Sequence, residues 1–198
     1  MDKIEEYNLW IRFKSGDNQA LSVLYKLYAN QLYSYGIKIS REESLVKDCI
    51  QEVFINLADK RNRLIISDKT HLYLFKSLRN KIIEEYRSNS RKRNIEKNMV
   101  HDLDNQILSA EERIVVSEDE HFQKKIISDA IKSLSEHQQE AIFLKFSEGL
   151  NYEDIAIILD VEIASVRTLM YRTLKELKEN ISRKGIFLLS IIHILKSR

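Results

Sequence analysis

The chain has no proline and only four glycines among its 198 residues. Average usage would place roughly ten prolines and fourteen glycines in a chain of this length. Turns between antiparallel strands draw on both residues, so their scarcity argues against hairpin-rich β architectures. The glycines stand at Gly16, Gly36, Gly149 and Gly185, too far apart for a dinucleotide fingerprint or a nucleotide-binding P-loop. The sequence therefore predicts an all-α protein.

The cysteine and histidine content excludes the common metal and redox sites. Cys49 is the single cysteine, so it forms neither an internal disulfide nor a cysteine-based zinc site, which suits a reducing cytosol. The five histidines are scattered and make no H-E-x-x-H pair. A hydrolytic enzyme would need convergent acid–base or metal groups, and no such spacing occurs. We therefore expect no catalytic residues, no metal, no cofactor and no enzymatic activity.

The formal net charge of +2 conceals two strongly charged blocks. Residues 61–97 contain 11 Lys and Arg against 4 Asp and Glu, whereas residues 98–120 contain 1 against 7. A basic block followed directly by an acidic one predicts a polyanion-binding segment beside a solvated linker. The N-terminal residues, MDKIEEYNLW, lack the basic and then apolar layout of a secretory signal.

Apolar residues recur at helical spacing through the first half of the chain. Asp17 is a predicted N-cap, and the helix after it carries Leu21, Leu24, Tyr25, Tyr28, Leu32 and Tyr33. Ser40 and Glu43 are predicted to form a capping box for the next helix, whose apolar residues are Val46, Cys49, Ile50, Val53, Phe54 and Leu57. A polar break over residues 61–70 precedes a third helix with Leu72, Phe75, Leu78, Ile82 and Tyr86.

The second half contains a pattern typical of a helix-turn-helix. Ser135 and Gln138 form a second predicted capping box, and Gly149 stands where a helix end favours a left-handed residue. Asn151 is predicted to cap a short helix over residues 152–159, and a tight turn over residues 160–162 leads to a longer helix near residue 163. Ala156 is the small residue of the first helix, Asp160 is the turn residue, and the apolar set is Ile155, Leu159, Val161, Val166 and Leu169.

With that apolar set inward, the second helix presents a polar face that suits the major groove of DNA. The residues on this face are Ser165, Arg167, Thr168, Tyr171, Arg172 and Lys175. Arg reads guanine edges or phosphates, Ser and Thr bind either, and Tyr contacts phosphates or a thymine methyl group. The alternative is an ordinary helical hairpin with a solvated face.

Taken in order, these segments resemble the extracytoplasmic-function (ECF) sigma factors, the small two-domain promoter-recognition subunits of bacterial RNA polymerase. The resemblance covers nearly all of residues 7–180. It rests on LYKLYANQLYSYG (Leu24–Gly36), DCIQEVF (Asp48–Phe54), SLRNKIIEEYR (Ser77–Arg87), the run Leu134–Val161, and ASVRTLMYRTLKEL (Ala164–Leu177). The resemblance implies two small helical domains, residues 1–97 and the helix-turn-helix domain 121–182, joined by the acidic linker 98–120 and followed by an apolar tail, residues 183–198.

The resemblance also implies a role for each exposed face. Asp48, Gln51, Glu52 and Asn56 would dock on the clamp coiled coil of the largest polymerase subunit, although such a face is otherwise read as solvated. The basic helix would hold the unwound −10 promoter strand through Lys76, Arg79, Asn80, Lys81, Arg87 and Arg91, the alternative again being a solvated basic helix. The helix-turn-helix face would bind the −35 element.

The implied function is promoter-specific transcription initiation, with core RNA polymerase, promoter DNA and an anti-sigma factor as partners. The implied location is the bacterial cytoplasm, on the nucleoid when the protein is active. The alternative function is a helix-turn-helix regulator that does not engage core polymerase as a sigma subunit. It would share the helix-turn-helix but not the DCIQEVF face.

The C-terminal segment Lys184–Arg198 lies outside the resemblance. The residues from Ile186 to Leu195 are apolar apart from Ser190 and His193, but a membrane span needs about twenty such residues, so no integral membrane segment is expected. Three interpretations stay open: a helix packed on the C-terminal domain, a partner-docking segment, and a peripheral membrane anchor.

Overall fold

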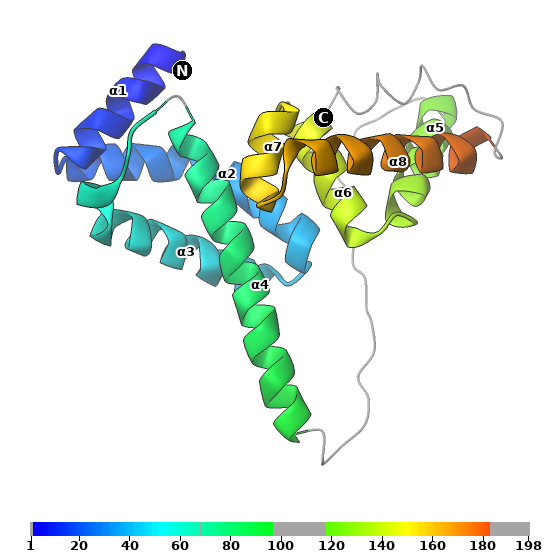
Figure 1. Ribbon diagram of the computed structural model, residues 1–198, viewed down its shortest axis with the longest axis horizontal. Coiled ribbons are helices and arrows are strands. Elements are labelled where there is room, and N and C mark those ends of the chain that lie inside the picture. The colour runs from blue at the N-terminus through cyan, green and yellow to red at the C-terminus, as the bar shows by residue number, and fades with distance from the viewer. Residues whose placement is uncertain (1, 68, 97–117, 183–198) are drawn as a thin grey trace.

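The computed structural model describes residues 2–67, 69–96 and 118–182, and at residues 3, 89–96, 118–124 and 182 it describes the backbone alone. The described residues form helices and contain no strand, as the sequence predicted (Figure 1). The first half contains α1 (Lys3–Lys14), α2 (Asn18–Ser40), α3 (Glu43–Asp59), the short 3-10 turn η1 (Arg61–Arg63) and α4 (Thr70–Glu96). The second contains α5 (Glu118–Lys132), α6 (Glu136–Ile142), the π-helical turn η2 (Phe143–Ser147), α7 (Tyr152–Leu159) and α8 (Ile163–Ser182).

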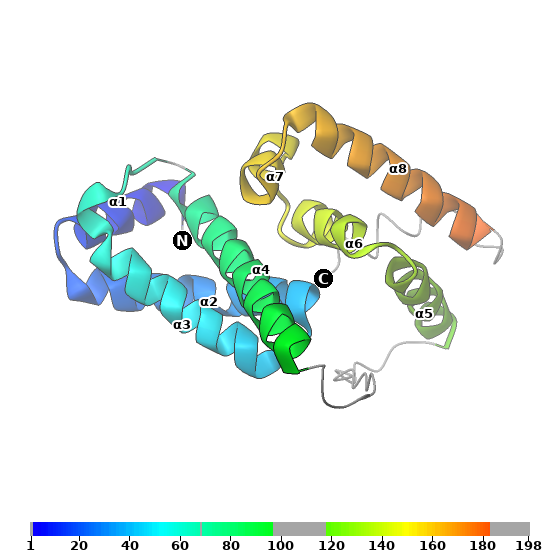
Figure 2. The ribbon, with the colours of Figure 1, turned by 60° about the horizontal axis from the view of Figure 1, so that its bottom comes forward.

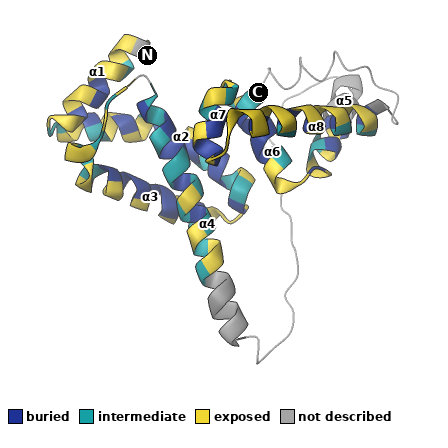
Figure 3. Cartoon of the chain, in the orientation of Figure 1, coloured by how far each residue is buried: buried dark blue, intermediate teal, exposed yellow. Residues whose placement is uncertain are grey.

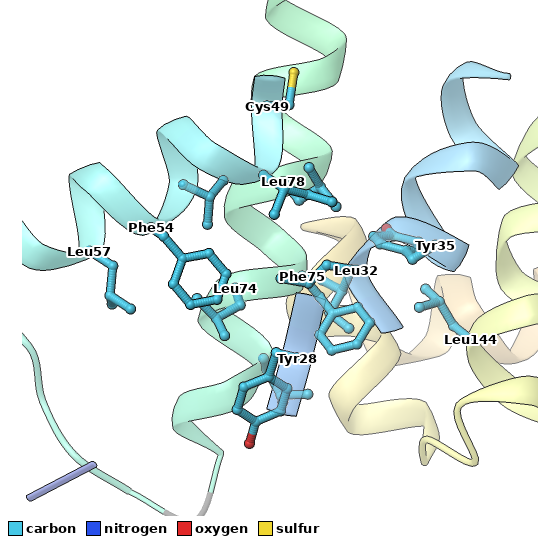
Figure 4. Close-up of a cluster of buried hydrophobic side chains, with 14 of the residues drawn as sticks. Tyr28, Leu32, Tyr35, Cys49, Phe54, Leu57, Leu74, Phe75, Leu78 and Leu144 are labelled. Atoms are coloured by element: carbon cyan, nitrogen blue, oxygen red, sulfur yellow. The ribbon is translucent and has the colours of Figure 1, made fainter. Parts of the chain in front are cut away.

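In the N-terminal half, α2, α3 and α4 pack against one another, and α1 lies on α2. The apolar stripes that the sequence predicted on α2, α3 and α4 supply the core, which Figure 4 shows around Leu32, Phe54 and Leu78. Trp10 of α1 is 1% exposed and closes one end of this core against Phe13 and Tyr28. The C-terminal half has a second core, in which α5, α6 and α8 meet around Ile127, Ile142 and Leu177.

Several helix ends follow the local signals in the sequence. The Asp17 carboxylate accepts hydrogen bonds from the backbone N–H groups of Gln19 and Ala20, and the Asn151 side chain accepts from that of Asp154. Ser135 and Gln138 form the predicted capping box at the start of α6. These caps satisfy N–H groups that have no partner within their own helix.

The capping box predicted at Ser40 and Glu43 is wrong. Helix α2 continues to Ser40 and ends because Arg41 adopts the left-handed conformation, with φ 57°. Helix α3 then begins after Glu42, whose side chain makes no capping hydrogen bond. The buried Ser40 instead connects α2 to α4. The Tyr86 hydroxyl of α4 donates to the Ser40 carbonyl at 2.6 Å and lies 3.0 Å from its Oγ.

The two halves pack directly on each other, a feature that the sequence did not predict. Helix α7 packs on α4, and α6 contacts α2. Figures 1 and 2 both show α7 beside α4. The larger hydrophobic core is continuous across this junction, since Leu144 and Ile158 belong to the same cluster as Leu78. Figure 4 shows Leu144 beside Tyr35 of α2.

Two sequence-derived expectations lie largely or wholly outside the described residues. Most of the acidic linker, residues 98–117, and the apolar tail, residues 183–198, are not described, whereas residues 118–120 belong to α5. Across residues 2–67, 69–96 and 118–182, no helix is both long and apolar enough to cross a membrane.

Gly36 permits the close approach of α2 to α3. A Cβ atom at this position would lie 2.5 Å from Val46 Cγ1 and 3.3 Å from Val46 Cγ2, and Val46 is fully buried. We expect Gly36→Ala to lower the free energy of unfolding by about 1–2 kcal/mol. The cost of overpacking, typically about 1–3 kcal/mol, outweighs the gain of up to about 1 kcal/mol that Ala brings to a helix interior. Denaturation in urea measures the difference.

Ser34→Ala, on the exposed side of the same helix, is the matched control and should change the stability by no more than about 0.5 kcal/mol. The double variant Gly36→Ala/Val46→Ala should lose less stability than the two single variants together, because shortening Val46 removes the obstruction. Strict additivity would contradict this explanation.

Candidate nucleic-acid interface

The turn between α7 and α8 has the geometry that the sequence predicted for a helix-turn-helix. Asp160 adopts the left-handed conformation, with φ 58° and ψ 49°, and its backbone N–H bonds to the carbonyl of Ala156. Asp tolerates this region better than most residues other than glycine. Ile155 and Val166 are fully buried between the two helices. The apolar residues therefore hold α8 across α7 with its opposite face exposed.

That opposite face carries all six residues predicted to read duplex DNA. Ser165, Arg167, Thr168, Tyr171, Arg172 and Lys175 are all exposed, and Figure 3 shows the exposed stripe along α8. Tyr171 is 70% exposed, which is unusual for a large aromatic side chain unless it serves a contact. One prediction for the apolar set is wrong: Val161 is 46% exposed, because the turn at Asp160 carries it outward.

Helix α3 presents a second exposed face, made by the residues that the resemblance linked to polymerase. Asp48, Gln51, Glu52 and Asn56 are exposed, whereas Cys49, Ile50, Val53 and Phe54 are buried, as predicted. Burial raises the pKa of the Cys49 thiol to about 11, so the thiol stays protonated and acts as an apolar side chain. Ile55 also belongs to this face, since it is 61% exposed, but it was not predicted from the sequence. Its position outside the helical period of the buried residues is the signal that could have identified it as exposed.

Helix α4 carries the basic residues, but most of those described are already engaged. Asn80 and Arg87 are exposed. Lys81 Nζ lies 2.6 Å from Glu52 Oε2 and 3.2 Å from Glu85 Oε1, and these contacts, the Glu52 hydrogen bond first, raise the pKa of Lys81. Lys81 of α4 thus links Glu52 on the exposed face of α3 to Glu85 on α4. The side chain of Arg91 lies outside the described residues.

The other two predicted residues, Lys76 and Arg79, bind carboxylates from the C-terminal half. Lys76 Nζ lies 2.6 Å from Asp160 Oδ1, and this hydrogen bond lowers the pKa of Asp160. Arg79 Nε donates to Glu140 Oε1 at 3.0 Å, and the two side chains are only 12% and 8% exposed. Exposed pairs contribute about 0–1 kcal/mol, whereas removing one partner of a buried pair costs about 3–5 kcal/mol. The Arg79–Glu140 pair is therefore the dominant contact.

The described side chains contain no group of three or more His, Cys, Asp or Glu that could hold a metal ion. The chemistry of these faces is charge, hydrogen bonding and aromatic contact. Such surfaces bind nucleic acid and protein.

Comparisons with known proteins match both halves of the chain. The family "Sigma-70 region 2" matches residues 24–92, and the family "Sigma-70, region 4" matches residues 124–177. The curated relatives include the ECF RNA polymerase sigma factor SigM of Bacillus subtilis, 22% identical over 156 residues that cover 78% of this chain and 91% of the relative. They also include the ECF RNA polymerase sigma-E factor of Haemophilus influenzae, 27% identical over 184 residues, covering 90% and 96%.

Two solved structures share the fold. The sigma factor RpoE of Bartonella quintana, in complex with the anti-sigma factor NepR, matches with a TM-score of 0.63 at 20% identity, covering 81% of this chain and 96% of the other. CnrH, in complex with the cytosolic domain of CnrY, matches with a TM-score of 0.60 at 15% identity, covering 90% and 98%.

The left-handed turn at Asp160 can be tested apart from its ion pair. Asp160→Gly and Asp160→Ala both remove the carboxylate that binds Lys76, but only Ala strains the backbone at φ 58°. We expect the free energy of unfolding of Asp160→Ala to lie about 1 kcal/mol below that of Asp160→Gly. Urea denaturation of the two variants decides the point, and an Ala variant as stable as the Gly variant would show that the turn does not need this conformation.

Proposed function

Because this chain belongs to the ECF sigma factors of the sigma-70 family, we propose that its three exposed faces divide the work of promoter recognition. The protein directs promoter-specific transcription initiation and is not an enzyme. The observation that carries the proposal is the order of the faces: a polar α3 face and a basic helix in the segment matching region 2, then a helix-turn-helix in the segment matching region 4.

The α3 face is the proposed contact with core RNA polymerase. Asp48, Gln51, Glu52 and Asn56 lie along one side of a helix whose other side is buried, so a partner can contact them without any rearrangement of the core. Ile55, exposed among them, adds an apolar centre of the kind found in protein–protein interfaces. The acidic residues fit a basic and polar coiled coil on the largest subunit.

The helix-turn-helix face is the proposed −35 contact. Arg167 and Arg172 can bind guanine edges or phosphates, and Ser165, Thr168, Tyr171 and Lys175 surround them. The α4 face is the proposed −10 contact, through Asn80 and Arg87, which are exposed, and through Lys76, Arg79, Lys81 and Arg91. Single-stranded DNA binds such basic helices mainly through its phosphates.

The proposed domains are residues 1–97 and 121–182, with an acidic linker over residues 98–120 and a tail over residues 183–198. The proposed partners are core polymerase, promoter DNA and an anti-sigma factor. The anti-sigma factor is proposed because the similar sigma factor RpoE has been solved in complex with the anti-sigma factor NepR. The place of action is the bacterial cytoplasm, on the nucleoid when the protein is active.

Run-off transcription with purified core polymerase, on the DNA upstream of the chain's own gene, tests the proposal. The wild-type chain should yield a promoter-directed transcript. Asp48→Arg should lower the affinity for core polymerase at least about tenfold, because it places a cation on a face that meets a basic target. Glu43→Arg reverses a charge on the same helix but is turned away by the helical period, so it is the control and should bind normally.

Arg167→Ala/Arg172→Ala should keep polymerase binding but lose the transcript and flatten the salt dependence of duplex binding. Each lost phosphate contact should reduce the slope by about 1. Failure of transcription on every template, with polymerase still bound, would favour the alternative of a diverged helix-turn-helix regulator.

A further inference from the structure

We propose that the C-terminal half of the free chain occupies the cationic surface of α4, with Glu140 as the central contact, so that the closed chain excludes single-stranded DNA. The surface consists of Lys69, which directly precedes α4, and of Lys76 and Arg79 within α4; it is named here the α4 cationic row. The inference rests on the proposed function in one respect, namely that Lys76 and Arg79 of this row are part of the DNA-binding surface.

The α4 cationic row meets three carboxylates from three separate places in the C-terminal half. Lys69 Nζ lies 2.8 Å from Asp154 Oδ1 in α7, and Lys76 Nζ lies 2.6 Å from Asp160 Oδ1 in the turn. Arg79 bonds to Glu140 of α6. Lys69 directly precedes α4, and Lys76 and Arg79 follow within the helix at spacings of seven and three residues, which places them on one side of it. The carboxylates therefore neutralise the same cations that the phosphates of a bound DNA strand would neutralise, and they occupy the place of those phosphates.

Glu140 is the most buried of the three carboxylates, its side chain being 8% exposed against 14% for Asp154 and 73% for Asp160. Its Oε1 accepts a hydrogen bond from Arg79 Nε at 3.0 Å and one from the Tyr35 hydroxyl at 2.6 Å, and Tyr35 is fully buried. Burial and the Glu140 charge raise the pKa of Tyr35 well above its usual value, so the hydroxyl remains a donor. The side chains of Lys76 and Asp160 are 35% and 73% exposed, so solvent screens that pair.

Aromatic contacts next to Glu140 hold the same junction. The Phe143 ring, at the start of the π-helical turn η2, stacks on Tyr35 with centroids 6.1 Å apart, and Lys38 Nζ lies 6.0 Å from the Phe143 centroid. A DNA strand cannot reach Arg79 while Glu140 and Phe143 occupy this place. By contrast, Asp48 and Gln51 on α3 are exposed in the closed chain. In the closed chain, polymerase can therefore bind α3 while the C-terminal half still covers the α4 cationic row.

If only the open chain binds the strand, the apparent dissociation constant equals the intrinsic one divided by the open fraction. Weakening the Glu140 contact should then strengthen DNA binding even though no DNA contact is added. The probe is a fluorescein-labelled oligodeoxythymidylate, titrated with the full chain without polymerase. We expect Glu140→Ala to bind it at least about tenfold more tightly than wild type, and Glu140→Gln to fall between the two.

Glu136→Ala is the matched control. It removes the same charge from the exposed first turn of the same helix, so it reports how much the net charge alone contributes. Its affinity should stay within about twofold of wild type. Circular dichroism of each variant verifies that the helices are intact. An affinity gain of Glu140→Ala no larger than that of Glu136→Ala would overturn the proposal.

A charge exchange tests the contact independently of DNA. Arg79→Glu and Glu140→Arg each place like charges together and should enlarge the radius of gyration measured by small-angle X-ray scattering. The double variant Arg79→Glu/Glu140→Arg restores opposite charges and should return it towards the wild-type value. Single variants with the same radius of gyration as the wild type and the double variant would overturn the closed chain. Both tests use the chain without polymerase, so they are independent of the run-off assay. Variants that expand but do not bind DNA more tightly would overturn the link to DNA. A failed run-off assay would instead count against the proposed function.

Discussion

A carboxylate removed from water must have its charge compensated, and in this chain that requirement falls on Glu140. It receives hydrogen bonds from Arg79 and Tyr35, both from the other half of the molecule. Neither half could bury its share of this cluster alone, because an unpaired buried charge is strongly destabilising. The relative placement of α6, α2 and α4 therefore depends on this one contact, and the continuous apolar core around Leu144 fills the space beside it.

Helix α4 is where the proposed activities of the protein meet. Its buried side, with Leu74 and Leu78, completes the N-terminal core. Its charged side binds Glu52 of the α3 face through Lys81 and the C-terminal half through Lys76 and Arg79. A partner on the α3 face and a DNA strand on α4 thus act on neighbouring groups of one helix. Binding at one of these two surfaces can therefore affect the other without a rearrangement of the N-terminal core.

Sequence reasoning succeeded where a structural feature depends on neighbouring residues. The caps at Asp17, Ser135 and Asn151, the left-handed turn at Asp160 and the exposed face of α8 all follow from local spacing. Helix α1 was missed because its buried residues, Leu9, Trp10 and Phe13, alternate with the exposed Ile4, Tyr7 and Ile11, which obscures the helical period. The Ser40–Glu43 box failed because α2 continues through Ser40, which hydrogen-bonds to Tyr86, 46 residues away.

The contacts between the two halves could not be predicted from neighbouring residues, because their partners are also distant in the sequence. The partners of Glu140 lie 105 and 61 residues away along the chain, and the partner of Asp160 lies 84 residues away. A charge count identifies the basic block but cannot show that part of it is already neutralised from within. The residues predicted to bind the −10 strand were therefore expected to form an open surface, whereas in the structure Lys76, Arg79 and Lys81 are paired.

We expect the C-terminal half to leave α4 when the protein binds promoter DNA. Hydrogen exchange measured by mass spectrometry, on the free chain and on the chain bound to core polymerase and promoter DNA, tests it most directly. Amides of α6 and α7 should be protected in the free chain and should lose protection in the complex, while amides of α2 and α3 should stay protected. Unchanged protection of α6 and α7 in a transcribing complex would contradict it.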